Sequence, residues 1–435
     1  MPPPPEPVET PATTGDGGAV ADGVTVAYGF EAVDEYVARD PHPTYRHWRE
    51  TGGARRVRFA GPVPLAGWVV TEYAACRAAL ADPRLSKDGA TEAFARYAGL
   101  PTGGPGGGLT THMLNSDPPR HTRLRRLVQQ AFTTRRVAAL RPRIEARVTA
   151  LLDALEETAV DTTGAVDLIG RFALPLPLAV IFDLLGADPD DPGVLQVRGH
   201  SVAGNEGDGE VSVPTADAML DRLRALVEEK RSRPGDDLLS ALAAARDDGG
   251  DGGGGWGALS EEEITSMAFL LVVAGHQTTV NLIANGLHAL FTHPEQLAAV
   301  RADVSLVPGL IEEVLRHESP FGIATLRYTT EPVTIQGTAI PAGEFVQIAL
   351  LAANRDPEVF PDPDRFDVTR DTSGHLAFGH GIHHCLGAPL ARLQAEIAFT
   401  RLLRRFPALR PAATPAAWQD NPRHRGLLTL PAHLH

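Results

Sequence analysis

The most informative stretch of this 435-residue chain is Ala377-Phe378-Gly379-His380-Gly381-Ile382-His383-His384-Cys385-Leu386-Gly387-Ala388-Pro389. Its glycines tighten a loop that ends on one of the two cysteines of the chain, and Pro389 falls in the first turn of the helix that we expect next. A cysteine directly before a helix meets free backbone N–H groups and the positive end of the helix dipole, which favour the thiolate. A thiolate held in this way donates electrons strongly to a metal.

Three interpretations of Cys385 are open on these grounds. The first is a thiolate ligand to a metal, and the second is a small core residue, the commonest fate of a lone cysteine. The third is zinc, because His375, His380, His383 and His384 lie nearby. No second cysteine or distant histidine pair completes the usual zinc spacing.

The composition limits the possible partners. The net charge of -14 argues against nucleic acid or an anionic membrane surface, while 43% hydrophobic residues suffice for a large core. Two cysteines, Cys76 and Cys385, cannot make a disulfide framework for so large a chain, which favours a reducing compartment. The cations are nearly all arginines, since Lys87 and Lys230 are the only lysines.

No stretch approaches the ~20 apolar residues that span a bilayer. The richest run, Met267 to Gly275, fits a buried helix better. The start, Met-Pro-Pro-Pro-Pro, has neither basic residues nor an apolar core and does not resemble a secretion signal. We therefore predict a cytoplasmic protein with no membrane and no nucleic-acid partner.

The chain reads as a mostly-α fold in one large domain. Residues 1–22 are predicted to be a disordered Pro/Gly-rich tail, and 23–435 the domain. Ser260 and Glu263 form a capping box that starts a helix able to run to Phe291, about 32 residues or roughly 48 Å. Further helices are predicted over 121–132, 137–155, 216–231 and from Pro308 to before Ser319-Pro320, and strands at 68–71, 333–335 and 345–348.

The cysteine loop resembles the haem-binding signature of the cytochrome P450 family, with Phe378, Gly381, Cys385 and Gly387 at the expected spacing. The resemblance covers about residues 28–435 and implies that family's fold, a triangular prism of helices with a minor β region. It also implies haem b as cofactor and Cys385 as the iron ligand, whose thiolate favours O–O cleavage. Phe378 would shield the sulfur, and its hydrogen bonds would come from the N–H groups of Leu386, Gly387 and Ala388.

Glu313-Val-Leu-Arg316 places opposite charges three residues apart on one helix face, which in isolation is an ordinary solvated pair. Pro363-Asp364-Arg365-Phe366 follows it, and resembles the family segment whose arginine joins that pair in a buried network. The resemblance implies a structural triad of Glu313, Arg316 and Arg365.

His121 and Arg125 lie four residues apart on one helix face, a pattern that alone is more often a basic surface. In similar proteins these positions bind the haem propionates, since a guanidinium matches a carboxylate. Arg327 and His383 match the family's other propionate contacts.

The long helix contains Ala274-Gly275-His276-Gln277-Thr278. Gly275 costs roughly 1 kcal/mol against alanine in a helix interior, so a reason for it is expected. The family's reason is a groove for oxygen, and Thr278 matches the hydroxyl that helps to protonate the bound oxygen. The neighbouring position is usually an acid, whereas Gln277 has no proton to release.

The resemblance implies a monooxygenase that inserts one oxygen atom from O₂ into a largely apolar small molecule, such as a polyketide. Haem would do the hard chemistry, and a separate ferredoxin with its ferredoxin reductase would supply electrons. Two other classes remain: a peroxide-using or oxidative-coupling enzyme on the same fold, slightly favoured by Gln277, and a haem-binding protein without turnover, against which Thr278 argues.

The same resemblance implies mobile lids, substrate contacts and a docking patch for the electron donor. The loop 101–108 and the segment 189–213 are expected to act as mobile lids. Uncharged substrate contacts are expected at Leu270, Val273, Ala274, Ile323, Thr325 and Leu428. A basic docking patch for an acidic ferredoxin is expected at Arg120, Arg123, Arg126, Arg392 and Arg401.

Overall fold

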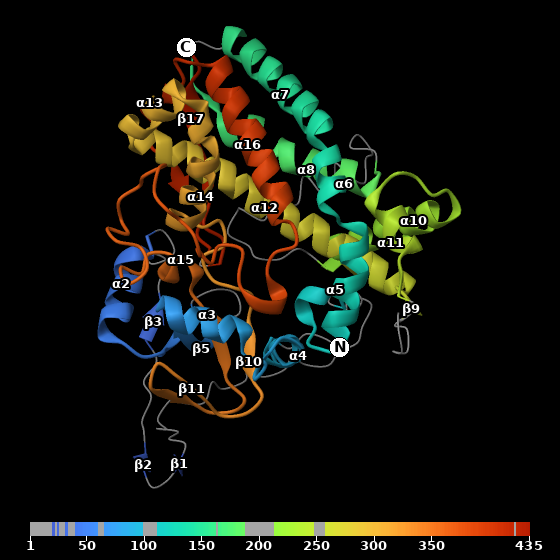
Figure 1. The fold of residues 1–435 in the computed structure, drawn as a ribbon, viewed down its shortest axis with the longest axis vertical. Coiled ribbons are helices and arrows are strands. Elements are labelled where there is room, and N and C mark those ends of the chain that lie inside the picture. The colour runs from blue at the N-terminus through green and yellow to red at the C-terminus, as the bar shows by residue number, and fades with distance from the viewer. Residues whose placement is uncertain are drawn as a thin grey trace, which may run out of the picture.

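The computed structural model describes residues 40–59, 65–98, 111–161, 164–187, 213–247, 257–421 and 423–435, with three short strands before residue 40. Helices dominate this part of the chain, as predicted (Figure 1). The longer ones are α2 (His42–Thr51), α3 (Tyr73–Ala81), α4 (Asp88–Tyr97), α5 (Arg120–Ala131), α7 (Arg141–Asp161), α8 (Pro175–Leu185), α10 (Val213–Ser232), α12 (Glu261–Thr292), α13 (Pro294–Ala302), α14 (Val307–His317) and α16 (Ala388–Arg405).

The central element is α12, which packs against α8, α10, α14 and α16 (Figure 1). The Ser260 hydroxyl accepts a hydrogen bond from the Glu263 N–H at 3.1 Å, and the Glu263 carboxylate accepts one from the Ser260 N–H at 2.9 Å. The predicted capping box is therefore present, and it satisfies two N–H groups that a helix start leaves open. The helix is long and apolar enough to cross a membrane, but most of its apolar stretch is buried inside the protein.

A small sheet lies at the end of the protein opposite α7 and α13 (Figure 1). Its order is β3 (Glu31–Val33), β4 (Arg55–Phe59), β5 (Leu65–Val70), β13 (Phe345–Ile348), β10 (Arg327–Thr329) and β6 (Leu85–Ser86). The central strands β5 and β13 pair in parallel, with Trp68 opposite Val346. The remaining predicted strand, at 333–335, is β11 (Val333–Ile335), which forms a hairpin with β12 (Thr338–Ile340).

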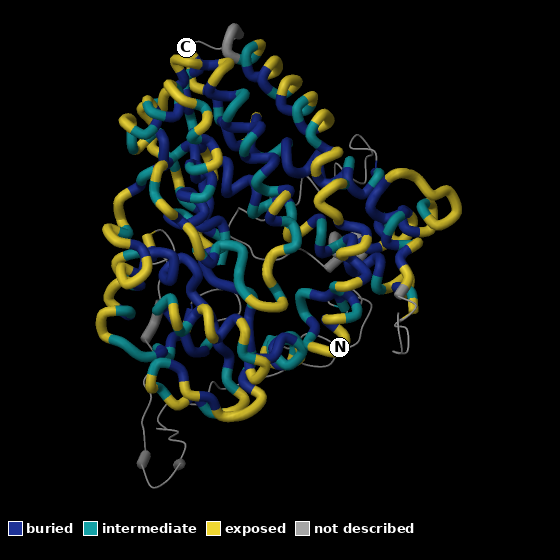
Figure 2. The backbone as a smooth tube through the Cα atoms, viewed as in Figure 1, coloured by how far each residue is buried: buried dark blue, intermediate teal, exposed yellow. Residues whose placement is uncertain are grey.

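The core has a large helical part around α12 and a smaller part on the sheet. Figure 2 shows buried backbone running through the centre and exposed residues along the outer sides of α7 and α13. Cys76 belongs to the smaller part, where its thiol contacts the Val70 carbonyl oxygen at 3.2 Å. Cys76 is therefore a buried core residue.

The predicted helix over 137–155 is two helices, α6 (Thr134–Ala139) and α7. The break is at Leu140, because Pro142 has no N–H to continue the first helix and suits the first turn of the next. The predicted lids and most of the predicted tail lie outside the described residues. Within the tail, only β1 (Val20–Ala21) is described, and it pairs with β2 (Val24–Thr25).

Candidate active site

The cysteine loop is shaped by its own backbone. Gly379 and Gly381 both have a φ of 73°, which side chains rarely tolerate. The Cys385 N–H donates to the Phe378 carbonyl oxygen at 2.8 Å and closes the loop. A Cβ on Gly381 would lie 3.3 Å from the Cα of Ala81, so this glycine also permits contact with the end of α3. The loop therefore delivers Cys385 directly before α16, as predicted.

Opposing effects act on the Cys385 sulfur. Burial raises the pKa of the thiol, while the N–H groups of Gly387 and Ala388 and the guanidiniums of Arg125 and Arg392 lower it. The effect of burial is the largest of these, so the pKa of the thiol is raised overall. The residue nevertheless keeps accessible surface for a ligand.

The zinc interpretation fails on geometry. The described residues contain no cluster of three or more His, Cys, Asp or Glu side chains that suits a metal. His375 instead contacts the Glu312 carboxylate at 3.0 Å, and the His383 ring lies against His121.

The two predicted basic residues of α5 lie beside this loop. The ring centroids of His121 and His383 are 4.4 Å apart. Arg125 donates to the His384 carbonyl oxygen at 2.8 Å. The Nε2 atoms of both His121 and His383 are buried and have no hydrogen-bond partner within the described ranges.

Arg327 and Lys87 extend this group. Arg327, on β10, is 4% exposed, donates to the carbonyl oxygens of Leu80 and Leu85 at 3.4 Å, and has an unpartnered Nε. Lys87, directly before α4, is 2% exposed and donates to the Leu326 carbonyl oxygen at 3.1 Å. We call His121, Arg125, Arg327, His383 and Lys87 the basic cluster.

The basic cluster carries more positive charge than its surroundings compensate. Burial, followed by the charge of Arg327, lowers the pKa of His383 to about 2, and burial lowers the pKa of Arg327 to about 10. Among the described residues, Asp117 is the carboxylate near the basic cluster. It already accepts hydrogen bonds from the Ser86 hydroxyl and the Lys87 N–H. Buried cations with unpaired nitrogens fit a ligand with more than one negative charge.

On α12, the polar side chains bond along the helix. The Thr278 hydroxyl donates to the Ala274 carbonyl oxygen at 2.8 Å, and the Gln277 amide donates to the Asn281 side-chain oxygen at 3.1 Å. The Thr278 oxygen and the Gln277 carbonyl oxygen remain able to accept hydrogen bonds. Gly275 has a packing reason as well, since a Cβ there would lie 2.7 Å from the Ile181 side chain of α8.

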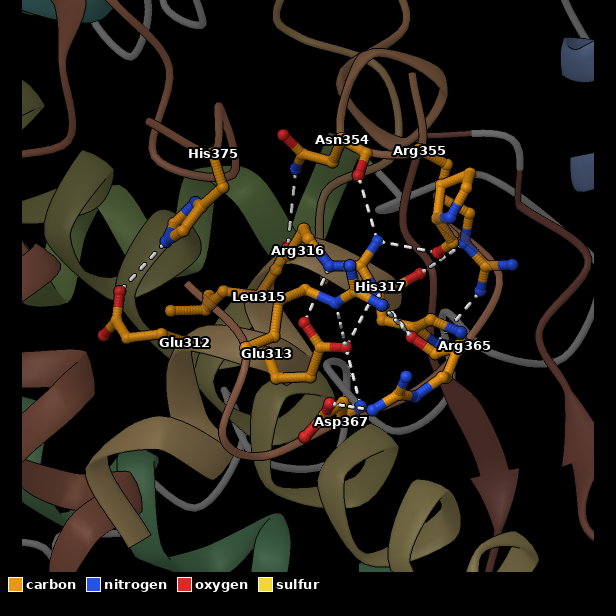
Figure 3. A network of polar contacts seen from close by, with 12 residues as sticks. Glu312, Glu313, Leu315, Arg316, His317, Asn354, Arg355, Arg365, Asp367 and His375 are labelled. Carbon is orange, nitrogen blue, oxygen red and sulfur yellow. Dashed lines mark hydrogen bonds and ion pairs between the residues drawn. The ribbon is translucent and has the colours of Figure 1, made fainter. Parts of the chain in front are cut away.

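The predicted triad is buried, but its third member differs (Figure 3). Arg316 donates to the Glu313 carboxylate at 2.7 and 2.8 Å, and both side chains are fully buried. Arg365 contributes its backbone carbonyl oxygen, 3.3 Å from Arg316, while its guanidinium pairs with Asp367. Arg370 supplies the second guanidinium, 3.5 Å from Glu313. The expectation for the Arg365 side chain was wrong because the chain presents its carbonyl group to the pair.

Comparison with known proteins decides the family. The family model described as Cytochrome P450 matches residues 214–432. Cytochrome P450 monooxygenase PikC of Streptomyces venezuelae is 46% identical over 402 residues, 92% of each chain. The chain is a cytochrome P450. The 6-deoxyerythronolide B hydroxylase of Saccharopolyspora erythraea is 44% identical over 408 residues, 91% of this chain and 96% of that protein.

Solved structures agree with this P450 assignment. The ligand-free P450 monooxygenase TamI has a TM-score of 0.82 and 45% identity, over 94% of both chains. TamI bound to tirandamycin C has a TM-score of 0.81 and 44% identity, over 93% of this chain and 100% of that one. The predicted mostly-α P450 fold is confirmed. Cytochromes P450 hold a haem iron, and the accessible sulfur and the basic cluster fit an iron complex that carries two carboxylates.

Lys87 is the member of the basic cluster that sequence reasoning missed. A single lysine carries no motif, and its burial depends on the packing of β6 and β10, which lie far apart in the chain. The one signal in the sequence that could have pointed to Lys87 is composition, because this chain uses arginine almost everywhere and has only two lysines.

The expected substrate contacts divide into two groups. Val273 is 50% exposed and Leu428 is 37% exposed, and Ala274 is also exposed, although the neighbouring turns of α12 are buried. Ile323 is 1% exposed and packs in a core cluster with Trp48 and Val69, so the expectation for Ile323 was wrong. Leu270 is buried as well, and Thr325 is partly exposed.

The expected basic docking patch is largely neutralised in this P450. Three of its five arginines form ion pairs: Arg123 with Glu263 at 2.6 Å, Arg392 with Glu312 at 2.6 Å and Arg401 with Glu145 at 2.9 Å. Arg120 donates to the Thr111 carbonyl oxygen at 3.1 Å. Charges held in this way attract a distant acidic partner weakly, and docking of a ferredoxin at this face stays a prediction.

Proposed function

We propose that this P450 binds haem b with the sulfur of Cys385 as iron ligand. The loop residues Phe378, Gly381 and Gly387 position that sulfur, and His121, Arg125, Arg327 and His383 bind the two propionates. The unpartnered nitrogens of the basic cluster support this assignment, since a carboxylate would satisfy them. Bound haem supplies the activation of O₂ and the insertion of one oxygen atom into the substrate.

We propose that Ala274, Gly275, Gln277 and Thr278 form the catalytic stretch of α12. The Thr278 proton is engaged by the Ala274 carbonyl oxygen, so its oxygen would hold an ordered water rather than give up its own proton. Gln277 is tied to Asn281 and has no acidic proton. Proton delivery therefore runs through water held at Thr278.

The substrate that we propose is a largely apolar secondary metabolite of the polyketide type. The observation that carries this proposal is the accessible apolar surface of Val273 and Ala274, one turn before Thr278 on an otherwise buried helix. Apolar walls with few polar groups are typical of small-molecule sites. The relatives that hydroxylate 6-deoxyerythronolide B or bind tirandamycin C support the same class.

Electrons would come one at a time from a ferredoxin and its ferredoxin reductase, in the cytoplasm. Both cysteines are free, which suits a reducing compartment. The test is turnover of a polyketide panel with NADH, O₂ and such a pair, compared with hydrogen peroxide alone. Product that needs NADH and O₂ supports the proposal. Product from peroxide alone would instead make the protein a peroxide-using enzyme, and haem binding without any product would make it a haem-binding protein.

A further inference from the structure

Arg423 lies in the segment between β15 (Ala417–Trp418) and β16 (Leu427–Thr429). Its backbone is held on both sides. The Arg423 carbonyl oxygen accepts from the Gly322 N–H at 2.8 Å, and the Arg423 N–H donates to the Asn421 side chain at 2.9 Å. The position of this arginine is therefore built into the fold.

The same segment touches the catalytic helix. The Asn285 amide of α12 donates to the Arg425 carbonyl oxygen at 2.9 Å. A Cβ on Gly426 would lie 2.1 Å from the side-chain oxygen of Asn281, the residue that accepts from Gln277. The segment that carries Arg423 thus lies against the part of α12 beyond Thr278, through Arg425 and Gly426, and against the chain at Gly322.

The charge of Arg423 is uncompensated. Its guanidinium has no hydrogen bond or ion pair with the described part of the chain, and burial lowers its pKa with no carboxylate acting against this. Arg425, two residues later, shows the contrast, because it pairs with Glu318 at 2.9 Å and lies over the Trp418 ring. The positive charge of Arg423 instead helps to lower the pKa of two other basic groups, Lys87 and His424.

A cation that is partly withdrawn from water and has no partner loses hydration without compensation, and arginine cannot shed its proton to escape the cost. Arg423 also keeps part of its accessible surface, so a ligand can reach it. A guanidinium offers a fork of N–H groups that matches a carboxylate. We propose that Arg423 binds a carboxylate of the substrate, which then has an apolar body and one anionic end.

This proposal rests on the proposed function, which it refines by adding a charge to the substrate. The competing anion is a haem propionate, but the basic cluster already offers the propionates five groups of its own. The two sources differ in their consequences, because loss of a propionate contact loosens haem, whereas loss of a substrate contact does not.

The experiment uses the haem-loaded protein and measures spectral binding constants for saturated carboxylates from octanoate to hexadecanoate and for their methyl esters. We expect the wild type to bind each carboxylate about 10- to 100-fold more tightly than its ester, the usual range for a charged hydrogen bond. Arg423→Gln should abolish that preference and leave ester binding unchanged, and Arg423→Lys should keep part of it. Arg404→Gln, which removes an exposed arginine of α16, is the matched control and should behave as wild type.

Haem transfer to apomyoglobin, measured on the same proteins, separates the two anions. An unchanged transfer rate in Arg423→Gln, with the carboxylate preference lost, supports the proposal. Faster haem loss with the preference intact would assign Arg423 to a propionate and overturn it. Equal binding of carboxylates and esters by the wild type would also overturn it. None of these readouts requires turnover, so a failure here is distinct from a failure of the monooxygenase assignment.

Discussion

Cys385 is an exposed residue at the end of a loop that closes on it through backbone hydrogen bonds, and we propose it as the iron ligand. Cys385→Ser should leave a folded protein, because the loop is closed by backbone hydrogen bonds that serine can also make. The carbon monoxide complex of the reduced variant should lack the red-shifted Soret band that a thiolate ligand produces. Circular dichroism checks the fold, and Cys76→Ser serves as a control that keeps the band. A red-shifted band in Cys385→Ser would show that the Cys385 sulfur is not the iron ligand.

Gln277 and Thr278 make separate contributions to proton delivery. Gln277→Glu introduces a titratable group beside Asn281, whose amide nitrogen has no partner within the described ranges and can donate to it. This variant should form more product per NADH and release less hydrogen peroxide. Thr278→Ala should do the opposite, with a loss of up to ~10²-fold in product formation, the lower end for a positioned acid–base group. Parallel titration of NADH, peroxide and product would decide, and coupling that is unchanged in both variants would assign both residues to substrate positioning.

Lys87 allows a test with a built-in control, because the chain has one other lysine. Lys87→Gln should release haem to apomyoglobin about 10-fold faster, the lower end for a lost charged hydrogen bond. Lys230→Gln, which removes an ion pair with Asp237 on another side of the fold, should release haem at the wild-type rate. Equal rates of haem release by the wild type, Lys87→Gln and Lys230→Gln would show that Lys87 does not bind a propionate.

The loop and the helices around it depend on a second network of charges. Glu312 on α14 accepts hydrogen bonds from Arg392 of α16 at 2.6 and 2.8 Å and contacts His375 at 3.0 Å. Arg392 in turn lies over the Phe378 ring, 4.5 Å from its centroid. The network joins two helices to the start of the cysteine loop, so its loss should affect both stability and haem binding.

Burial raises the pKa of Glu312, but its hydrogen bonds outweigh this and lower the pKa from 4.5 to about 2. A depressed carboxyl pKa adds stability that is present above pH 4.5 and is lost as the pH falls toward 2. Because the side chain is 29% exposed, we expect Glu312→Gln to lower the unfolding free energy at pH 7 by about 1–2 kcal/mol. Urea titration from pH 7 to pH 3 should show the deficit shrinking. Glu396→Gln, which breaks an exposed pair with Arg141, should change little, and a deficit independent of pH would exclude this cause.

The elements could be predicted wherever local signals agree with packing. α12 follows from its capping box and apolar run, and the central strands follow from their β-branched residues. β4 was missed because its sequence, Arg-Arg-Val-Arg-Phe, hides the alternation at Val57 and Phe59 behind three arginines. The third triad arginine was misplaced because a motif specifies spacing, whereas the direction of Arg365 depends on a turn of the chain.

The family and its fold followed from four motifs, and the comparisons confirm them. Lys87 and Arg423 could not be found in that way, because the position of each depends on contacts between distant segments, with Leu326 and Gly322 respectively. Their significance is electrostatic, because neither the buried Lys87 nor the partly exposed Arg423 forms an ion pair with a carboxylate of the described residues. Such an excess of positive charge can be recognised only when the positions of all neighbouring charged groups are known.

Haem removal should therefore loosen the protein unevenly. Without a dianionic ligand, the basic cluster keeps its mutual repulsion, so α5 and the cysteine loop should exchange amide hydrogens faster. The core around α12, α14 and α16 is apolar and should remain protected. Hydrogen exchange on apo and haem-loaded protein measures this, and uniform loss of protection over all helices would contradict it.

Glu263 belongs to two helices at once. Its carboxylate caps α12 through Ser260 and also accepts from Arg123 of α5 at 2.6 and 3.1 Å. The helix proposed to hold a propionate and the first turn of the helix proposed to handle oxygen are thus joined at one point. We therefore expect the opening that admits a bulky substrate to take place away from the contact between Glu263 and Arg123. Substrate entry and oxygen activation would then depend on different parts of the protein.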